Sequence, residues 1–380
     1  MSSAVLEQQN VEPKKKTRFW NPGEYFDYSL LVIVLFLIGF GLVMVYSTSS
    51  YTASLRYQDA AYFLKRQGFF AVAGIIAMLF VSKIDYHFYK KVTGLAYLAA
   101  LVLSIIVQFA GREAGGSSRW IQIGPIGFQP SEFAKVAIVL IMALATTNRV
   151  WKMNSFVTLL QIMFPSLLLT GIIAIENLST AVICGVIIVA IVFVASPKYW
   201  HFLAVGGGAA VVLTLYILLW GYRGDRFDAW INYETHPKGY QTRQALYAIG
   251  SGGIWGKGLG QSIQKLDFIP EAHNDMIFSV ICEELGIVGG IALILMFIVL
   301  VWKLFRIIMN ARDLYGALLV VGILAHISAQ VLINLAVVTN TMPNTGIPLP
   351  FISYGGSSMI FLLMEIGIAL SVARQVKVRD

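Results

Sequence analysis

Long uninterrupted apolar runs are the feature that most limits what this sequence can fold into. A helix needs about 20 apolar residues to cross the hydrocarbon core of a bilayer. Each crossing segment has to be helical, because a lipid-exposed backbone must form its own hydrogen bonds. We therefore predict an all-α integral membrane protein with ten transmembrane helices, at residues 28–48, 67–82, 92–110, 131–147, 156–175, 179–196, 200–220, 276–303, 315–338 and 354–373.

The composition supports this fold class and leaves little of the chain for a soluble domain. Only 13% of the residues are charged, whereas a soluble domain carries about 25%. We predict a cytoplasmic tail at residues 1–25, a ten-helix membrane domain at 26–373 and a second cytoplasmic tail at 374–380. Within the membrane domain, a large extracellular loop at 221–274 connects the seventh and eighth spans.

The basic residues predict the orientation of the spans. Lysines and arginines collect on the side of the two tails, which the positive-inside rule places in the cytoplasm. The formal net charge of +8 is explained by this asymmetry, so no nucleic-acid partner is needed. The short outer connections contain only Arg56, Lys65, Arg66, Arg112 and Arg119.

Two outer connections after the seventh and ninth spans differ from ordinary loops. The segment at 221–274 is much longer than a usual loop, yet it is rich in apolar residues. We therefore predict that it is ordered, with a short interfacial helix at Gln241–Gly250. The segment at 339–352 contains Pro343, Pro348 and Pro350 and cannot be helical.

The turn that ends at Asp275 gathers polar side chains at the start of the eighth span. Asp275 is suited to capping that helix, and this interpretation needs no other residue. However, Glu271, His273 and Asn274 crowd the same turn. A carboxylate at a water–membrane boundary is also suited to act as a general base or to bind a divalent cation such as Mg²⁺ or Mn²⁺. The sequence leaves these roles of Asp275 open.

Two further carboxylates follow inside the same span. Helix geometry places Glu283 about 80° around the helix from Asp275, with Glu284 on the opposite side. Adjacent carboxylates are costly in lipid, so at least one must face the bundle interior. We interpret Glu284 as a buried structural residue and Glu283 as a candidate member of the Asp275 cavity. Glu365, deep in the last span, also needs an interior partner.

A second polar group lies around the start of the fourth span. Glu132 and Lys135 share one helix face, so they are suited to a local ion pair. Lys135 also lies one turn inside the bilayer, where its cation is suited to an anionic substrate. Together with the other basic residues of the outer side, which include Arg119, Arg243 and Lys257, it favours a phosphate-bearing ligand. Near the last span, Ser353 is suited to be its N-cap.

Three separated motifs resemble one family of membrane proteins. They are Ile269–Gly286, Gly115–Ile121 with Gln129–Lys135, and Gly346–Ser358. The chain is similar from about residue 25 onward to the SEDS family (shape, elongation, division and sporulation), and the wording of the motifs is closest to its FtsW and SpoVE branch. Two positions depart from the family pattern: Glu176–Thr180 replaces Pro-Asp-Leu-Gly-Thr, and Asn340-Thr341 replaces Gly-Leu.

The resemblance implies a peptidoglycan glycosyltransferase of the bacterial cytoplasmic membrane, which polymerises lipid II on the outer face. It implies a class B penicillin-binding protein as partner, together with other divisome or elongation proteins. The family's catalytic aspartate matches Asp275, and its functional arginine and lysine match Arg119 and Lys135. We expect Glu271 and Glu283 to support Asp275, and we expect substrate contacts from Arg119, Trp120, Glu132, Lys135, Arg243, Lys257, His273 and Ser353.

Two other functions are compatible with buried charges in a ten-span bundle. A lipid II flippase would use them in transport, but a transporter site lies near the midplane between repeats. Here the motif residues cluster on the outer side, and we find no repeat. A scaffold without catalytic activity would leave the placement of Asp275 and Lys135 unexplained.

Overall fold

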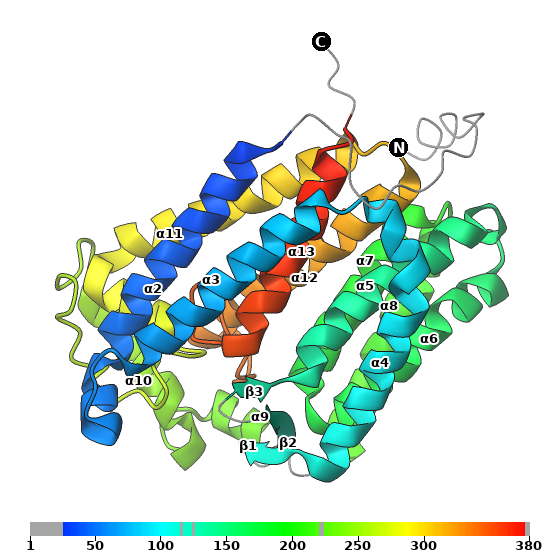
Figure 1. Cartoon of the computed structure of the whole chain (residues 1–380). Helices are drawn as coiled ribbons and strands as arrows, with labels where there is room; N and C mark the ends of the chain where they lie inside the picture. Colours follow the sequence, from blue (N-terminus) through cyan, green and yellow to red (C-terminus); the bar gives the residue numbers. More distant parts are fainter. Residues whose placement is uncertain (1–25, 115–116, 124–125, 220–223, 377–380) are drawn as a thin grey trace.

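The computed structural model describes residues 26–114, 117–123, 126–219 and 224–376, and most of these residues form long helices. The long helices lie side by side, and α2 begins at the same end of the bundle at which α13 ends (Figure 1). Their bounds are α2 Tyr28–Tyr57, α3 Tyr62–Lys83, α4 Tyr89–Ala110, α5 Pro130–Arg149, α6 Phe156–Glu176, α7 Leu178–Ala195, α8 Tyr199–Leu219, α11 Ile277–Met309, α12 Leu314–Val338 and α13 Gly356–Ala373.

The long helices confirm the all-α membrane fold. Within the described ranges, nine helices are long and apolar enough to cross a membrane. The seventh predicted span coincides with α8, which has 21 residues and contains no Asp, Glu, Lys or Arg. Each of the ten predicted spans therefore falls on a long helix. The first predicted tail, 1–25, lies wholly outside the described residues, and the second, 374–380, lies partly outside them, because 377–380 are not described.

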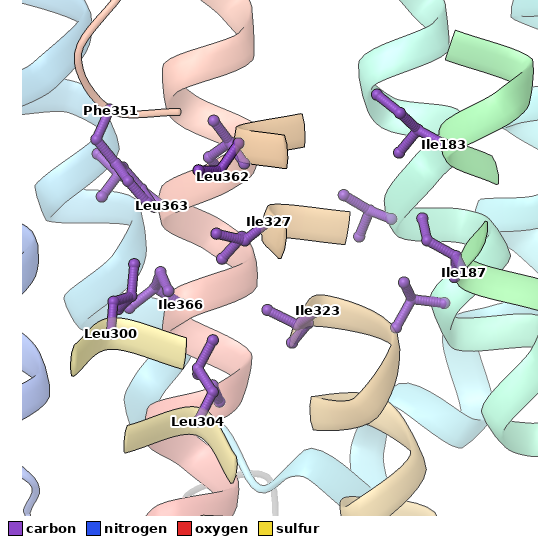
Figure 2. Close-up of a cluster of buried hydrophobic side chains, with 14 of the residues drawn as sticks. Ile183, Ile187, Leu300, Leu304, Ile323, Ile327, Phe351, Leu362, Leu363 and Ile366 are labelled. Atoms are coloured by element: carbon purple, nitrogen blue, oxygen red, sulfur yellow. The ribbon is translucent and has the colours of Figure 1, made fainter. Parts of the chain in front are cut away.

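The core of the bundle surrounds α12 and α13, which are the most buried of the membrane-spanning helices. Helix α13 packs against α3, and α12 packs against α7 and α11. Figure 2 shows the apolar side chains at this junction, including Ile323 and Ile327 of α12 and Leu363 and Ile366 of α13. Glu365 has the interior partner that the sequence required, because Nδ1 of His326 lies 2.7 Å from its Oε2 atom.

The outer end of the bundle contains the short elements (Figure 1). The predicted interfacial helix is α10, Tyr240–Gly252, and it follows α9, Gly224–Ile231, and a 3-10 turn at Pro237–Gly239. The segment after α12 is non-helical, as its prolines require. The sequence analysis did not predict strands here, but β1 (Arg112–Ala114), β2 (Ser117–Ile123) and β3 (Ile126–Phe128) form an antiparallel sheet.

At the opposite end, a histidine joins two carboxylates. The Nδ1 atom of His87 lies 2.8 Å from Asp85, and its Nε2 atom lies 2.7 Å from Asp313. Asp313 also caps α12, because its Oδ1 atom accepts a hydrogen bond from the Gly316 N–H. Gln375, which follows α13, donates to Asp85. These contacts, at the predicted cytoplasmic end, connect the loop before α4 to the start of α12 and the end of the last helix.

We predict that His87→Ala lowers the free energy of unfolding by about 1–3 kcal/mol, because it removes the side chain that contacts both Asp85 and Asp313. The thermal unfolding midpoint of the purified protein in detergent measures this. Lys65→Ala is the control, because Lys65 and Asp59 form an exposed pair of the kind that contributes little. Equal midpoints for His87→Ala and the parent chain would show that the contacts of His87 do not stabilise the fold.

Candidate active site

Asp275 lies in the turn immediately before α11 and is only 8% exposed. Of the roles that the sequence left open, the structure does not show a side-chain cap of this helix by Asp275. The helix begins at Ile277 with Met276 at the cap position, and the cap makes no side-chain hydrogen bond. Instead, the main-chain carbonyl of Asp275 accepts a 2.7 Å hydrogen bond from the side-chain amide of Asn334 on α12. The carboxylate is therefore left for other contacts.

The carboxylate of Asp275 lies beneath α10 and beside the segment that precedes α13. The Nε2 atom of Gln241, on α10, lies 3.4 Å from its Oδ1 atom. The Oε1 atom of Gln241 accepts a 3.0 Å hydrogen bond from Asn344. On the other side, a Cβ atom at Gly346 would lie 3.8 Å from Oδ2 of Asp275. Two parts of the chain far apart in sequence thus enclose one carboxylate.

Burial raises the pKa of Asp275 to about 6. The negative charge of Glu271 adds to the rise, while the Gln241 amide and main-chain N–H groups oppose it. A base is most effective when its pKa lies near the working pH. The environment of Asp275 therefore gives this carboxylate a proton affinity that suits general-base chemistry.

His273 packs against two aromatic rings close to Asp275. Its ring centroid is 4.4 Å from that of Phe63 and 5.6 Å from that of Tyr354. Burial lowers the pKa of His273 to about 4, so the ring is neutral at pH 7. Its carbonyl accepts a hydrogen bond from the Tyr354 N–H at 2.9 Å. His273 thus joins the Asp275 turn to the segment before α13 and brings no positive charge.

Glu132 and Lys135 form the ion pair that their spacing predicted. Lys135 is 1% exposed, and its Nζ atom lies 2.9 Å from Glu132. Glu132 also accepts a 2.7 Å hydrogen bond from the Ser358 hydroxyl on α13. The pair therefore binds the start of α5 to the start of α13. Its second predicted role, in holding an anionic substrate, stays a prediction.

Arg119 and Trp120 lie on β2, where the main chain of Trp120 pairs with Arg112 of β1. The side chain of Arg119 is outside the described part of the structure. Trp120 is partly exposed, and a Cβ atom at Gly127 of β3 would lie 3.2 Å from its ring.

Glu283 does not belong to the Asp275 cavity, and this corrects the sequence interpretation. Its carboxylate lies 2.7 Å from Lys257 and also accepts hydrogen bonds from Ser262 and from the main-chain N–H groups of Ile263 and Gln264. Lys257, a predicted phosphate contact, is thereby paired. Glu284 is buried and structural, as predicted, because Lys265 lies 2.8 Å away and Ser47 donates to it.

Two other predicted contacts are engaged with the protein itself. The guanidinium of Arg243 donates to the Glu234 carbonyl and lies 5.9 Å from the centroid of the Tyr240 ring. Ser353 is not the N-cap of the last span, because α13 begins at Gly356 after Gly355. The Ser353 hydroxyl instead accepts a 2.8 Å hydrogen bond from the Leu349 N–H and fixes the turn before the helix.

The structure therefore brings two of the sequence motifs to one segment, 344–358. The Asp275 carboxylate lies beside Gly346, the His273 carbonyl accepts a hydrogen bond from the Tyr354 N–H, and Glu132 accepts one from Ser358. Sequence reasoning missed Gln241, Asn334 and Asn344, which hold the Asp275 turn. Their amide groups are uncharged, and the candidate residues were chosen from the sequence mainly because they are charged. The position of Asn334 within an apolar span is the one cue that was available.

Comparison with known proteins identifies the family. The model for the FtsW, RodA and SpoVE family, described as cell cycle protein, matches residues 28–378. The chain belongs to this family. Stage V sporulation protein E of Bacillus subtilis is 38% identical over 356 residues, which cover 92% of this chain and 97% of that protein.

Two further comparisons agree with the family assignment. A probable peptidoglycan glycosyltransferase FtsW of Geobacter sp. is 36% identical over 363 residues, which cover 93% of this chain and 98% of that protein. A solved chain from "Structural coordination of polymerization and crosslinking by a peptidoglycan synthase complex" has a TM-score of 0.75 and 25% identity, with 93% of this chain and 99% of that chain covered. As an FtsW, RodA and SpoVE family member, the chain is a multi-pass protein of the cytoplasmic membrane.

The raised pKa of Asp275 predicts how stability depends on pH. Below pH about 4 the carboxyl is protonated in both the unfolded and the folded chain, and above pH about 6 it is ionised in both. Burial of the ionised form is unfavourable, so the native protein loses stability between these values as pH rises. We predict that Asp275→Asn is more stable than the parent at pH 7.5, by about 1–3 kcal/mol.

Unfolding midpoints of both proteins in detergent, measured across pH 4–7.5, test this prediction. The advantage of the Asn variant should disappear toward pH 4. Asp59→Asn is the control, because a hydrogen bond from Lys65 lowers the pKa of Asp59. A difference between Asp275→Asn and the parent that stays constant with pH would contradict the assigned cause.

Proposed function

We propose that this chain is a peptidoglycan glycosyltransferase that polymerises lipid II into glycan strands at the outer surface of the cytoplasmic membrane, during septal or spore-cortex synthesis. The observation that carries the proposal is the enclosed carboxylate of Asp275, whose pKa is raised to about 6 at one end of a membrane bundle. The relatives described above are named as a peptidoglycan glycosyltransferase and a sporulation protein. In this proposal the Asp275 carboxylate is the general base of the glycosyl transfer.

The reaction needs one proton acceptor and one stabilised leaving group. Asp275 removes the proton from the 4-hydroxyl of the incoming N-acetylglucosamine. The oxygen of that hydroxyl then bonds to the anomeric carbon of the growing strand, while the bond from this carbon to the undecaprenyl diphosphate breaks. Negative charge builds on the departing diphosphate, and fixed cations stabilise it.

The contacts in the structure suit some basic residues to holding the helices in place and others to binding the substrate diphosphate. Lys135 is buried and paired with Glu132, so the pair holds the start of α13 in place, and a contact of Lys135 with the anionic substrate is a separate proposal. Lys257 is paired with Glu283, but 31% of its side chain stays exposed, and Arg243 is partly exposed on α10, the helix that carries Gln241. We assign the diphosphate to Lys257 and Arg243 together with Arg119, whose matching family residue is functional.

A divalent cation is a separate proposal. In the described part of the chain, no group of three His, Cys, Asp or Glu side chains is placed to hold a metal ion. Asp275, with at most one further carboxylate, would be the protein ligand, and the substrate diphosphate and water would supply the other oxygen atoms. This donor set fits Mg²⁺, which is often held by one or two carboxylates plus phosphates. Bound there, the ion would neutralise diphosphate charge.

We further propose a class B penicillin-binding protein as the partner, with other divisome proteins alongside it. The structural neighbour comes from a peptidoglycan synthase complex that couples polymerisation with crosslinking. Strands made at the Asp275 end of this chain emerge at the outer surface, where a transpeptidase would crosslink them.

We predict that Asp275→Asn and Asp275→Ala lower the polymerisation rate by about 10²–10⁴-fold, the usual contribution of a general base. The assay follows glycan strands made from lipid II by the purified chain, with the partner present and the partner's own activities blocked. Asp267→Asn is the matched control, because Asp267 is an exposed carboxylate in the turns before α11.

The alternatives give different results in the same assay. Normal polymerisation by Asp275→Asn would remove Asp275 from the mechanism. A flippase would move labelled lipid II across vesicles without forming polymer, and its Asp275 variants would retain that movement. A scaffold would form no polymer in any variant and would still bind the partner.

The pKa of Asp275 also predicts the pH dependence of the rate. A general base acts when it is ionised, so the rate should rise with pH through about 6 and level off above it. The measurement is polymerisation at limiting lipid II between pH 4.5 and 8, because that regime reports groups of the free enzyme. Glu271→Gln removes a negative charge that raises the pKa of Asp275, so the midpoint should shift to lower pH. An unchanged midpoint in that variant would assign the transition to another group.

A further inference from the structure

Residues 253–268, which we call the boundary loop, follow α10 and lie against the first half of α11. Main-chain hydrogen bonds of 2.9–3.3 Å join the two: the N–H groups of Lys257 and Gly258 donate to Glu283 and Glu284, and those of Ile287 and Val288 donate to Gly253 and Ile254. The loop is therefore attached along more than one turn of α11, well past the first residue of that helix.

Glycine permits this close approach. A Cβ atom at Gly256 would lie 2.2 Å from the carbonyl oxygen of Glu284, and one at Gly286 would lie 2.2 Å from that of Ile254. Gly286 has φ 69° and interrupts the helical conformation of α11, a backbone state that glycine adopts without strain. The interruption occurs where the boundary loop contacts the helix.

The sequence of α11 locates this contact relative to the bilayer. The residues from Leu285 to Trp302 contain no charge, and they extend about 27 Å along a helix. This length is close to the 30 Å of the hydrocarbon core. The hydrocarbon therefore begins near Leu285, and the boundary loop, attached at residues 283–288, lies at the same depth.

Irregular backbone at membrane depth is tolerated only where its polar groups have partners. In the boundary loop, the N–H groups of Ile263 and Gln264 donate to the Glu283 carboxylate. The two cations of the loop are also paired, Lys257 with Glu283 at 2.7 Å and Lys265 with Glu284 at 2.8 Å. Because these N–H groups and lysines have partners within the protein, contact of the loop with lipid leaves fewer polar groups unsatisfied.

The outward surface of the boundary loop exposes several apolar side chains between Ile254 and Ile263, while the exposed carboxylate of Asp267 lies at the end of the loop. Trp255 is 80% exposed, and Ile254, Leu259 and Ile263 are each more than half exposed. The adjacent surface of α11 exposes further apolar side chains, at Ile287, Val288 and Ile291. The exposed side of the loop therefore continues the lipid-facing surface of a membrane span, and tryptophan is enriched at such interfaces.

We propose that the boundary loop is a membrane-binding element, in which Ile254, Trp255 and Leu259 insert among the headgroups and upper acyl chains of the leaflet at the Asp275 end. The occupant of this surface is bilayer lipid. The proposal concerns the position of the loop and does not depend on the proposed reaction.

Spin labels placed at Trp255→Cys and, separately, at Leu259→Cys test the proposal. The purified chain is inserted into nanodiscs of phosphatidylethanolamine and phosphatidylglycerol, and collisions of the label with oxygen and with a water-soluble nickel chelate are compared. Thr235→Cys, an exposed polar position of the same long connection, is the aqueous control. Leu295→Cys, exposed on α11, is the lipid control. The parent chain, whose Cys184 and Cys282 are buried, gives the background labelling.

The ratio of oxygen to nickel accessibility should be several-fold higher at positions 255 and 259 than at 235, and should approach that at 295. A ratio equal to that at 235 would place the loop in water and overturn the proposal. Labels shielded from both reagents, with spectra broadened by a neighbouring label, would show that a second copy of the chain covers the surface, which also overturns it.

Discussion

The side-chain amide of Asn334 holds the candidate active site together. From α12 it donates to the carbonyl of Asp275 at 2.7 Å and to the carbonyl of Ile347 at 2.8 Å. One buried group thus joins the turn before α11 to the segment before α13. These two carbonyls lie in irregular segments outside any helix, and a buried carbonyl without a partner is unfavourable. The enclosure of Asp275 between α10 and Gly346 depends on this contact.

The same physical constraint explains how the bundle holds its charged groups. Each interior carboxylate described above has a basic partner on another element or one turn along its own: Glu132 with Lys135, Glu283 with Lys257, Glu284 with Lys265, and Glu365 with His326. A buried charge without a partner is strongly destabilising. Asp275 differs, because it is buried and, among the described side chains, it is the neutral amide of Gln241 that donates to its carboxylate. Its raised pKa follows from that difference, and a proton acceptor is what the proposed chemistry requires of it.

The sequence predicted the spans well because the length of an apolar run is a local property set by bilayer thickness. It also predicted the Glu132–Lys135 pair, because the two residues are three apart on one helix, and it predicted that Glu365 needs an interior partner. It did not predict that Glu283 pairs with Lys257, 26 residues earlier in the chain. That pairing depends on how a long connection folds back, and no helical periodicity reports it. The short strands β1–β3 were missed because their sequence is rich in glycine and lacks clear alternation.

The attachment of the boundary loop to α11 fixes the number of residues between Asp275 and the contact at Gly286. Glu283 and Glu284 are consecutive, and their side chains pair with two different lysines of one loop. Inserting or deleting a single residue between Asp275 and Gly286 would rotate one part of the helix by about 100° relative to the other. With the change placed before Glu283, the chain could no longer keep both the contacts of the Asp275 turn and the ion pairs and glycine contact at residues 283–286. The eleven-residue step from Asp275 to Gly286 therefore acts as a spacer that sets the height of the carboxylate above the hydrocarbon. A change in that height requires the loop and the helix to change in concert.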